Sequence, residues 1–383
     1  MTDSRLVAEQ ADMVATAWSA PGSPSSWQLT AAQFAVLRDD DELLALASAI
    51  PADRLAPLLF SAAATSLILT LEPEPLRGWF PRLGEPQPRL APDFAAAYRA
   101  FCLEHGDELL ALCARHRYQM NEVGRCADFV PPLAGVADER REVVLVDIGT
   151  GAGLALHFDR YRYSYSASGS EPVHVGAPAS PVCVEVELAG ALRPRLPTEL
   201  PQVADRVGID VEPLDLTDPG VHGWLAACVP QEIGAVTRFH EAARVALDNP
   251  VRTLRGDACD VLPEVLDAIA PGPLVYIVDT YVNVFFTAPR LARFREIVDA
   301  VGRRRDLDWV STDPLVPMGP SATSTVTGVE APVELLERNR RGGVFGVVSR
   351  RSYRDGRLTE KILGAAHPSA LWLEWLDRGT SVP

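Results

Sequence analysis

Apolar residues follow different spacings in the first third of the chain and in the rest. In residues 30–49, 54–71 and 93–117 they recur every three or four positions between proline-rich turns, which predicts helices. Further along, short continuous apolar runs alternate with segments of helical period, as in α/β proteins with buried parallel strands. We therefore predict a helical domain over residues 1–135 and an α/β domain over residues 136–383.

The α/β domain is expected to hold a seven-stranded, mostly parallel, Rossmann-like sheet with helices on both faces. Its first strand, residues 143–146, consists of valine and leucine, which suits a central strand buried on both faces. Further strands are expected at residues 206–210, ahead of Gly256 and Asp279, and at residues 307–312. The sheet should end in an antiparallel hairpin that turns at residues 354–356.

An insertion interrupts this pattern. The strand at residue 206 begins 53 residues beyond Gly153, whereas a nucleotide-binding unit places about 20 residues there. Alternating residues predict a β-hairpin or small sheet inside an insertion of about 159–204. Its residues Tyr161 and Tyr163 form a lid or substrate wall on one interpretation. On the other they belong to a surface hairpin of stacked Tyr and Arg side chains.

A glycine-rich turn follows the first strand and is the main functional clue. Asp147 ends the strand, and Gly149, Gly151 and Gly153 let the backbone turn sharply and lie against a ligand. The D-x-G-x-G-x-G spacing, with Leu154 after the last glycine, differs from the G-x-G-x-x-G of dinucleotide-binding turns. It resembles the first motif of class I S-adenosylmethionine-dependent methyltransferases. Alternatively, Asp147 only caps the following helix.

Two later segments resemble further motifs of those methyltransferases. Asp210 ends the next strand and matches the acid that holds both ribose hydroxyls of S-adenosylmethionine, a task that suits a carboxylate. Glu185 or Glu187 would take this role if residues 182–188 were the second strand. Asp257, in a Gly-Asp-Ala segment, matches the position that meets the adenine, although a helix cap explains it too.

Candidate reactive groups follow the fourth strand and the final hairpin. Asp279 ends an apolar strand at the edge where open α/β sheets bind ligands, and it could act as a general base oriented by Tyr281 and Asn283. His367 is a second candidate base, because histidine titrates near neutral pH, or else a packed strand-end residue.

A polar segment just ahead of the sheet is a candidate substrate contact. Asn121, Glu122 and Arg125 gather there, and the segment could fold over the mouth of the pocket. The guanidinium of Arg125 suits the carboxylate of an amino-acid-like ligand. In the alternative interpretation this is an exposed helix end where Glu122 and Arg125 pair.

Several motifs together are similar to those of a family of bacterial proteins of unknown function. The resemblance spans about residues 95–378, and its motifs lie at residues 121–125, 147–153, 158–163, 208–218, 255–258 and 372–376. Members of that family more often carry a His and a Ser or Thr near the position of Asp279, and Pro-His-Gly after His367. The resemblance therefore identifies a family and implies no activity.

Composition narrows the choice of partners. The formal net charge of −15, from 51 acidic and 36 basic residues, offers no footprint for nucleic acid. Six scattered cysteines without a C-x-x-C pair indicate neither a metal site nor a disulfide framework, and they fit a reducing cytoplasm. Lys361 is the only lysine, which argues against a phosphate-binding G-K loop and against Schiff-base chemistry.

The apolar segments do not favour a membrane location. The N-terminus lacks a basic stretch followed by an apolar run, so no signal peptide is expected. Residues 55–71 carry no charge, but Pro57 and several Ser and Thr residues favour a buried helix over a membrane span. We expect a cytoplasmic protein.

Three hypotheses of function remain open. The leading one is an S-adenosylmethionine-dependent methyltransferase that acts on an N or O atom of a small metabolite, in secondary metabolism. A second is a diverged enzyme of the same fold that performs ring closure or elimination on an amino-acid-derived intermediate. A third is a scaffold subunit, homodimeric or bound to a different partner, whose cofactor pocket is vestigial.

Overall fold

The computed structural model describes residues 3–19, 27–139, 141–315, 329 and 331–377. The chain divides into two compact units. The first comprises Met1–Glu122 and Asp215–His240, and the second comprises Val123–Leu214 and Glu241–Pro383. The predicted division lay at residue 135. The first unit instead leaves the N-terminal part of the chain at Glu122, and it also includes a segment from the middle of the chain.

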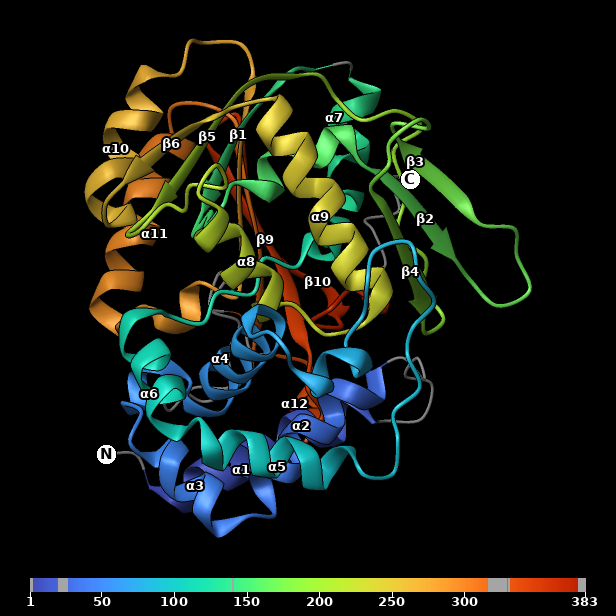
Figure 1. Cartoon of the computed structure of the whole chain (residues 1–383). Helices are drawn as coiled ribbons and strands as arrows, with labels where there is room; N and C mark the ends of the chain where they lie inside the picture. Colours follow the sequence, from blue (N-terminus) through green and yellow to red (C-terminus); the bar gives the residue numbers. More distant parts are fainter. Residues whose placement is uncertain (1–2, 20–26, 140, 316–328, 330, 378–383) are drawn as a thin grey trace. The chain divides into compact units, whose positions relative to one another are not determined.

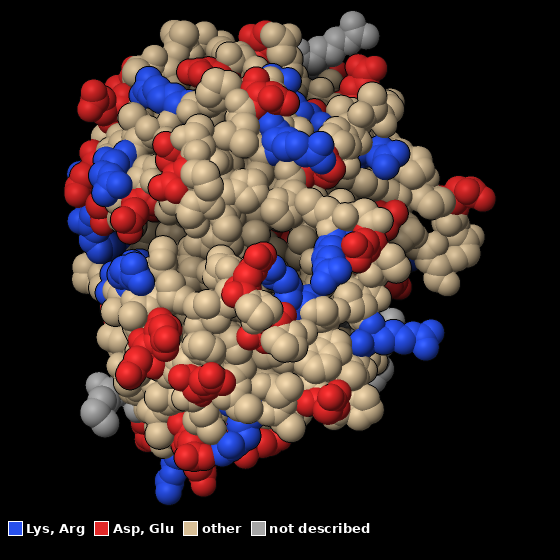
Figure 2. All heavy atoms as spheres, viewed as in Figure 1, with Lys and Arg blue, Asp and Glu red and all other residues tan. Residues whose placement is uncertain are grey.

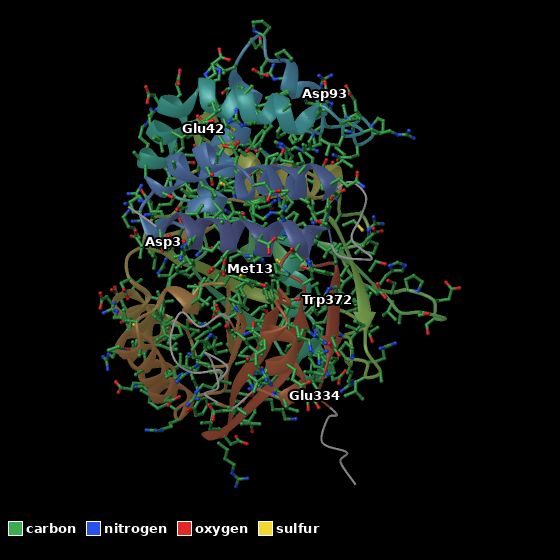
Figure 3. The ribbon with its side chains drawn as sticks, turned by 90° about the horizontal axis from the view of Figure 1, so that it is seen from below. Asp3, Met13, Glu42, Asp93, Glu334 and Trp372 are labelled. Carbon is green, nitrogen blue, oxygen red and sulfur yellow. The ribbon has the colours of Figure 1, made fainter. Side chains whose placement is uncertain are left out.

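The first unit is helical (Figures 1 and 3). Its helices are α1 (Ser4–Trp18), α2 (Gln28–Arg38), α3 (Asp41–Ser48), α4 (Ala56–Thr70), α5 (Phe94–Glu104), α6 (Gly106–Arg115) and α8 (Pro219–Cys228), together with the first half of α9 (Ile233–Asp248) and the short 3-10 helices η2 (Ala52–Arg54) and η3 (Pro75–Trp79). Figure 3 marks Asp3 and Met13 at α1, Glu42 on α3 and Asp93 ahead of α5.

Two of the predicted helices are each divided in two. The side chain of Asp40 accepts hydrogen bonds from the backbone of Glu42 and Leu43, at 3.1 and 3.0 Å, and so starts α3 as a separate helix. A second break falls at His105, between α5 and α6. The uncharged α4 is buried along most of its length, and no helix among the described residues is long and apolar enough to span a membrane.

The second unit is built on one sheet of eleven strands in the order β3-β2-β4-β11-β10-β9-β8-β7-β1-β5-β6. Six of the strands come from the regular α/β part: β1 (Val143–Ile148), β5 (Val203–Asp210), β6 (Arg252–Arg255), β7 (Leu274–Thr280), β8 (Leu307–Pro314) and β9 (Gly346–Arg354). The others are β2 (Arg162–Ser166), β3 (Val173–Gly176), β4 (Cys183–Ala189), β10 (Arg357–Ala366) and β11 (Trp372–Trp375).

The predicted central position of β1 is confirmed. It pairs in parallel with β5 on one side and β7 on the other, so that Asp147 lies beside Gly208 and Val278. Across the sheet the parallel strands lie in the order β6-β5-β1-β7-β8. The chain first adds β5 and β6 on one side of β1 and then continues with β7 and β8 on the other side, so the strand order reverses between β1 and β7. Ligands of open α/β sheets bind at the carboxyl ends of the strands at such a reversal.

The predicted hairpin is confirmed, but the predicted number of strands is wrong. β9 and β10 pair antiparallel around Asp355 and Gly356, whose positive φ angles of 49° and 72° suit a tight hairpin turn. The inserted strands do not stand apart as a hairpin. β4 pairs with β11, which pairs with β10, so the three inserted strands join the main sheet, and together with β11 they bring it to eleven strands instead of the predicted seven.

Helices cover one face of the parallel strands, and short 3-10 turns cover the other. On the first face, α10 (Ala258–Ala268) and α11 (Ala288–Gly302) pack into one apolar core with Val146, Ile277 and Trp309 (Figure 1). On the second, the Tyr276 hydroxyl donates to the Phe129 carbonyl at 2.6 Å. Phe129 lies between η4 (Val123–Asp128) and η5 (Pro131–Leu133), which lead into α7 (Ala134–Asp138). The remaining short helices are η6 (Leu154–Arg160), η7 (Asn283–Phe285) and α12 (Val333–Arg340).

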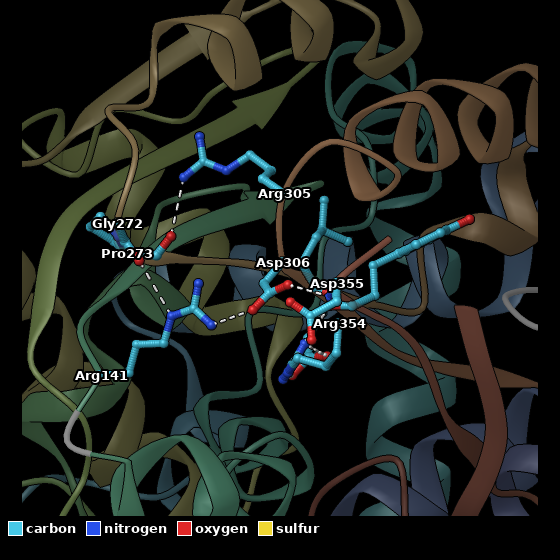
Figure 4. A network of polar contacts seen from close by, with 10 residues as sticks. Arg141, Gly272, Pro273, Arg305, Asp306, Arg354 and Asp355 are labelled. Atoms are coloured by element: carbon cyan, nitrogen blue, oxygen red, sulfur yellow. Dashed lines mark hydrogen bonds and ion pairs between the residues drawn. The ribbon is translucent and has the colours of Figure 1, made fainter. Parts of the chain in front are cut away.

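Arginines tie the amino ends of the strands together (Figure 4). Arg141, just before β1, pairs with Asp306 at 2.6 Å, and Asp306 also accepts the backbone N–H of Asp355 in the hairpin turn. Arg305 donates to three carbonyls of the loop before β7, among them that of Pro273 at 3.1 Å. Because these polar groups hydrogen-bond and pair with one another, they stabilise the amino edge of the sheet.

The glycine turn tolerates no side chain at its first position. Gly149 has a φ of +70°, and an added Cβ would lie 2.4 Å from Cγ2 of Val282. We expect Gly149→Ala to lower the free energy of unfolding by about 2–3 kcal/mol, from backbone strain and overpacking together. Urea unfolding measures this, with Gly135→Ala as the control, because Gly135 lies in a helix with no atom within 4 Å of its added Cβ. Equal stability of the two variants would contradict the assignment.

Candidate functional site

The glycine turn and Asp210 meet at the carboxyl ends of β1 and β5. The backbone N–H of Gly151 donates to Oδ2 of Asp210 at 2.8 Å, and the N–H of Glu212 donates to Oδ1 at 2.8 Å. The N–H of Gly149 donates to the carbonyl of Ile209 at 2.8 Å. Asp210 is only half-buried, and each of its oxygens retains acceptor capacity, so the carboxylate can also bind a ligand.

Asp147 lies below the turn and is buried. It accepts a hydrogen bond from the Thr150 hydroxyl at 2.7 Å. Burial raises the pKa of Asp147 to about 7, and the nearby carboxylate of Asp210 adds to the rise. Thr150 also fills the space beside Gly208, where an added Cβ would lie 2.6 Å from its Cγ2. Asp147 therefore stabilises the turn from its buried side, through Thr150.

The segment after the glycine turn differs from the expectation. A helix was expected to follow the turn. The chain instead forms the 3-10 segment η6, kinked at His157, and passes directly into β2. The seven residues between Gly153 and Tyr161 thus form no α-helix.

Asp257 caps a helix, as the simpler of its two interpretations predicted. Its side chain caps α10 by accepting the N–H of Cys259 at 2.8 Å, and it also forms an ion pair with Arg290. It lies just beyond β6 and is half-buried. A contact with adenine stays a prediction.

The alternative second strand does not neighbour β1. β4, which carries Glu185 and Glu187, lies between β2 and β11, far along the sheet order from the glycine turn. Asp210, at the end of β5 beside β1, is therefore the candidate for the ribose-binding acid, and Glu185 and Glu187 are not.

Asp279 belongs to a buried polar cluster at the ends of β7 and β8. Its carboxylate accepts hydrogen bonds from Trp309 Nε1 at 2.6 Å, Ser311 Oγ at 2.7 Å and Asn283 Nδ2 at 2.8 Å. Asp313 contacts the same serine and asparagine, each at 2.9 Å. All five side chains are at least nine-tenths buried.

The number of donor protons favours a proton shared between these two carboxyl groups. Asn283 Nδ2 brings two protons and also contacts Ser311 Oγ at 3.0 Å, while Ser311 brings one proton. These three protons can fill only three of the four contacts that Asn283 and Ser311 make with Asp279 and Asp313, and a proton on one of the two carboxyl groups would fill the fourth. Burial raises the pKa of both carboxyl groups, and their mutual repulsion raises that of Asp279 further. Asp279 is thus sealed and fully engaged, which does not favour a direct role as general base.

Tyr281, Arg125 and His367 meet beside this cluster. The Arg125 guanidinium lies 4.2 Å from the centre of the Tyr281 ring, and its Nε donates to the Pro368 carbonyl at 2.8 Å. Tyr281 has a φ of +59°, which is strained for a bulky residue, and no described residue bonds its hydroxyl. Such strain is typical of functional positions.

His367 is neutral near pH 7. Burial lowers its pKa to about 4, and the positive charge of Arg125 contributes. Its Nδ1 accepts the backbone N–H of Ser369 at 3.1 Å, so the ring proton lies on Nε2. In this tautomer Nε2 of His367 can donate a hydrogen bond, and the ring is not ready to act as a base.

Asp128 is the group that the sequence analysis missed. It is 1% exposed, its Oδ2 has no hydrogen-bond partner among the described residues, and burial raises its pKa to about 7. The Thr312 hydroxyl and the charge of Arg125 oppose that rise, and the Asp128 charge in turn raises the pKa of Tyr281. The only signal in the sequence is its place three residues after Arg125.

The other predicted substrate contacts lie elsewhere. Asn121 belongs to the first unit, where its side chain donates to the Gln119 carbonyl at 3.3 Å. Tyr161 and Tyr163 are fully buried, and their hydroxyls donate to the carbonyls of Leu154 and Phe158, at 2.6 and 2.7 Å. The alternative interpretation, a surface hairpin of stacked Tyr and Arg side chains, is therefore wrong for these two tyrosines, because their rings are buried in the core. A substrate role for these tyrosines stays a prediction that their burial does not favour.

The face shown in Figure 2 has no concentrated charge, because acidic and basic side chains are interspersed over it. No group of three or more His, Cys, Asp and Glu side chains among the described residues has the geometry to hold a metal ion.

The raised pKa of Asp128 makes stability depend on pH. Below about pH 4 the carboxyl is protonated both in the folded and in the unfolded chain. Between about pH 4 and 7 only the unfolded chain ionises, so the free energy of unfolding falls as the pH rises. The rise in pKa corresponds to at most about 4 kcal/mol. Asp128→Asn should flatten this part of the profile, measured by urea unfolding from pH 4 to 8.

Glu171→Gln is the control for that measurement, because Glu171 is an exposed carboxylate of the same unit. Asp147 keeps its own contribution in both variants, so the profile of Asp128→Asn should keep some slope. A profile of Asp128→Asn identical to that of the unmodified protein would contradict the burial of Asp128 as an acid.

Comparison with known proteins confirms the family resemblance and extends it to the N-terminal helices. No curated protein matches the sequence. One family model, described as an uncharacterized protein conserved in bacteria (DUF2332), matches residues 9–375 and so covers nearly all of both units. The chain belongs to this family.

Proposed function

We propose that the protein is an enzyme that binds S-adenosylmethionine at the carboxyl edge of β1 and β5 and methylates a small metabolite. The contact between the Gly151 N–H and Asp210, at 2.8 Å, carries the proposal. It joins a glycine turn and an acid beside the reversal of strand order, where open α/β sheets bind ligands.

The residues of this edge fit an adenosyl group. Asp210 is half-buried, and each oxygen has already accepted one backbone N–H, which leaves one lone pair on each for the two hydroxyls of a ribose. Gly149, Gly151 and Gly153 all have positive φ, so no Cβ stands between the backbone and a ligand. The cofactor would supply a methyl group already activated on a sulfonium.

The acceptor side is assigned to Arg125, Asp128 and Tyr281. Arg125 is held over the Tyr281 ring, where a guanidinium can bind the carboxylate of a substrate. Asp128, whose pKa lies at about 7, can take the proton from an attacking amine or hydroxyl at neutral pH. The Tyr281 hydroxyl can donate to the substrate or accept from it. Asp279 and Asp313 then fix the ends of β7 and β8 and do not touch the substrate.

A second candidate is proton-transfer chemistry without methylation, such as ring closure or elimination. Asp128 favours it, because its pKa of about 7 lets the same carboxyl group accept a proton and return it near neutral pH, as ring closure or elimination requires. Substrate turnover without formation of S-adenosylhomocysteine would select this candidate.

Loss of the Asp210 carboxylate should abolish most cofactor affinity. We expect Asp210→Ala to weaken binding of S-adenosylmethionine at least tenfold in isothermal titration calorimetry, because two hydroxyl contacts disappear. Asp205→Asn, an exposed change on the same strand, should bind as the unmodified protein does. Unfolding curves establish that each variant is folded. No binding by the unmodified protein would refute the cofactor assignment.

Asp128 should affect turnover and not cofactor affinity. Once a substrate is found, Asp128→Asn is expected to lower kcat by about 100-fold or more, as for loss of a general base, with the affinity for S-adenosylmethionine unchanged. Asp128→Glu should restore part of the activity. If Asp128→Asn retains full turnover across the pH range, another group removes the proton.

A further inference from the structure

Two carboxyl groups lie close together at the carboxyl ends of β1 and β5, and the glycine turn bonds both. Asp147 lies beside Gly208 in the parallel pairing of these strands, and Asp210 follows two residues later on β5. The Thr150 hydroxyl donates to Oδ2 of Asp147 at 2.7 Å. The next residue, Gly151, donates its N–H to Oδ2 of Asp210 at 2.8 Å. A negative charge on Asp210 therefore acts on Asp147 across the turn.

The two acids are compensated unequally. Each oxygen of the half-buried Asp210 accepts one backbone N–H. Asp147 is 5% exposed, and among the described residues it accepts only the Thr150 hydroxyl, on Oδ2. Its Oδ1 has no such bond, yet it does not belong to the sealed side-chain atoms without a partner, as Oδ2 of Asp128 does. One oxygen of Asp147 is thus neither bonded nor sealed.

Charged side chains around Asp147 do not favour its ionisation. In the sheet it lies between Gly208 of β5 and Val278 of β7, which are both uncharged. The elements η4, η6, β5 and β7 carry further titratable groups, namely Asp128, His157, Asp159, Arg160, Arg206 and Asp279. The pKa of Asp147 responds to none of them. Burial raises that pKa to about 7, the charge of Asp210 adds to the rise, and the Thr150 hydroxyl opposes it.

A ligand cation would supply the positive charge that this pair of acids lacks. A cation beside Asp147 and Asp210 favours the ionised form of Asp147 by Coulomb attraction, which solvent screens weakly at a buried carboxylate. Near neutral pH the protein is a mixture of chains with Asp147 protonated and chains with Asp147 ionised. Binding of a cation and loss of this proton are therefore linked, whereas a neutral ligand has no such effect.

We propose that the carboxyl edge of β1 and β5 takes up a cationic ligand in exchange for a proton that Asp147 holds on Oδ1. The proposal rests on the proposed function, in which S-adenosylmethionine, with its sulfonium and its ammonium group, is that ligand. The proton passes to solvent, and Asp210 keeps its role toward the ribose. Between pH 6 and 8 the ionised fraction of Asp147 rises from about one tenth to about nine tenths, so affinity for the cation should rise about tenfold.

Isothermal titration calorimetry in two buffers of different ionisation enthalpy counts the protons released. At pH 6.5 the unmodified protein should release about 0.5–0.7 proton more than Asp147→Asn on binding S-adenosylmethionine. The asparagine keeps an oxygen for the Thr150 hydroxyl and cannot titrate, and the groups of the ligand itself contribute equally to both proteins. Asp205→Asn, an exposed change on the same strand, should release as many protons as the unmodified protein.

A second variant and a second ligand test the cause of the release. Thr150→Val removes the hydroxyl that lowers the pKa of Asp147, so its proton release should persist to higher pH than that of the unmodified protein. This variant decides if Asp147→Asn does not fold. Adenosine carries no cation, and its binding should release equal numbers of protons from the unmodified protein and from Asp147→Asn.

The possible results separate this exchange from the proposed function. Binding of S-adenosylmethionine with equal proton counts in the unmodified protein and Asp147→Asn would overturn the exchange and leave the cofactor assignment standing. Equal release with adenosine and with S-adenosylmethionine would also overturn it, because the cation would then not be the cause. Absence of heat with both ligands would refute the proposed function, and the exchange with it.

Discussion

The hydrogen bond between the Gly151 N–H and Asp210 is the contact on which the carboxyl edge of the sheet depends. It fixes the loop after β1 against the end of β5, and Gly149 completes the contact through its own N–H on Ile209. Val282, at the end of β7, fills the space where a side chain on Gly149 would lie. Three neighbouring strands thus end in a defined arrangement because the turn between them carries no side chains there.

Burial of carboxyl groups is the second feature of this edge. Burial raises the pKa of Asp128 and Asp147 to about 7, and it also raises the pKa of Asp279 and Asp313, which both contact Ser311 and Asn283. Buried acids reduce stability at neutral pH unless protons or donors compensate them. Here donors compensate Asp279 almost completely, whereas Asp128 keeps an oxygen without a partner, which is the condition expected of a reactive group.

Arginine performs most of the cationic tasks in a chain that has a single lysine. At the amino edge the planar guanidinium of Arg305 reaches three carbonyls, and that of Arg141 pairs with Asp306. At the carboxyl edge the guanidinium of Arg125 lies on the Tyr281 ring. These geometries need several donors in one plane and a weakly hydrated cation, which an ammonium group does not provide.

The sequence by itself determined the local elements that have a strong periodic or turn signal. The valine run of β1, the acid at the end of β5 and the Asp355-Gly356 turn were predictable, because burial on both faces and positive φ each restrict the residue types. Only the tertiary structure decided that the insertion joins the main sheet, since strand pairing depends on partners far apart in the chain. It also brought Asp128 to Thr312 and sealed Asp279 beneath Trp309, because burial and the resulting pKa values arise from contacts that no local pattern records.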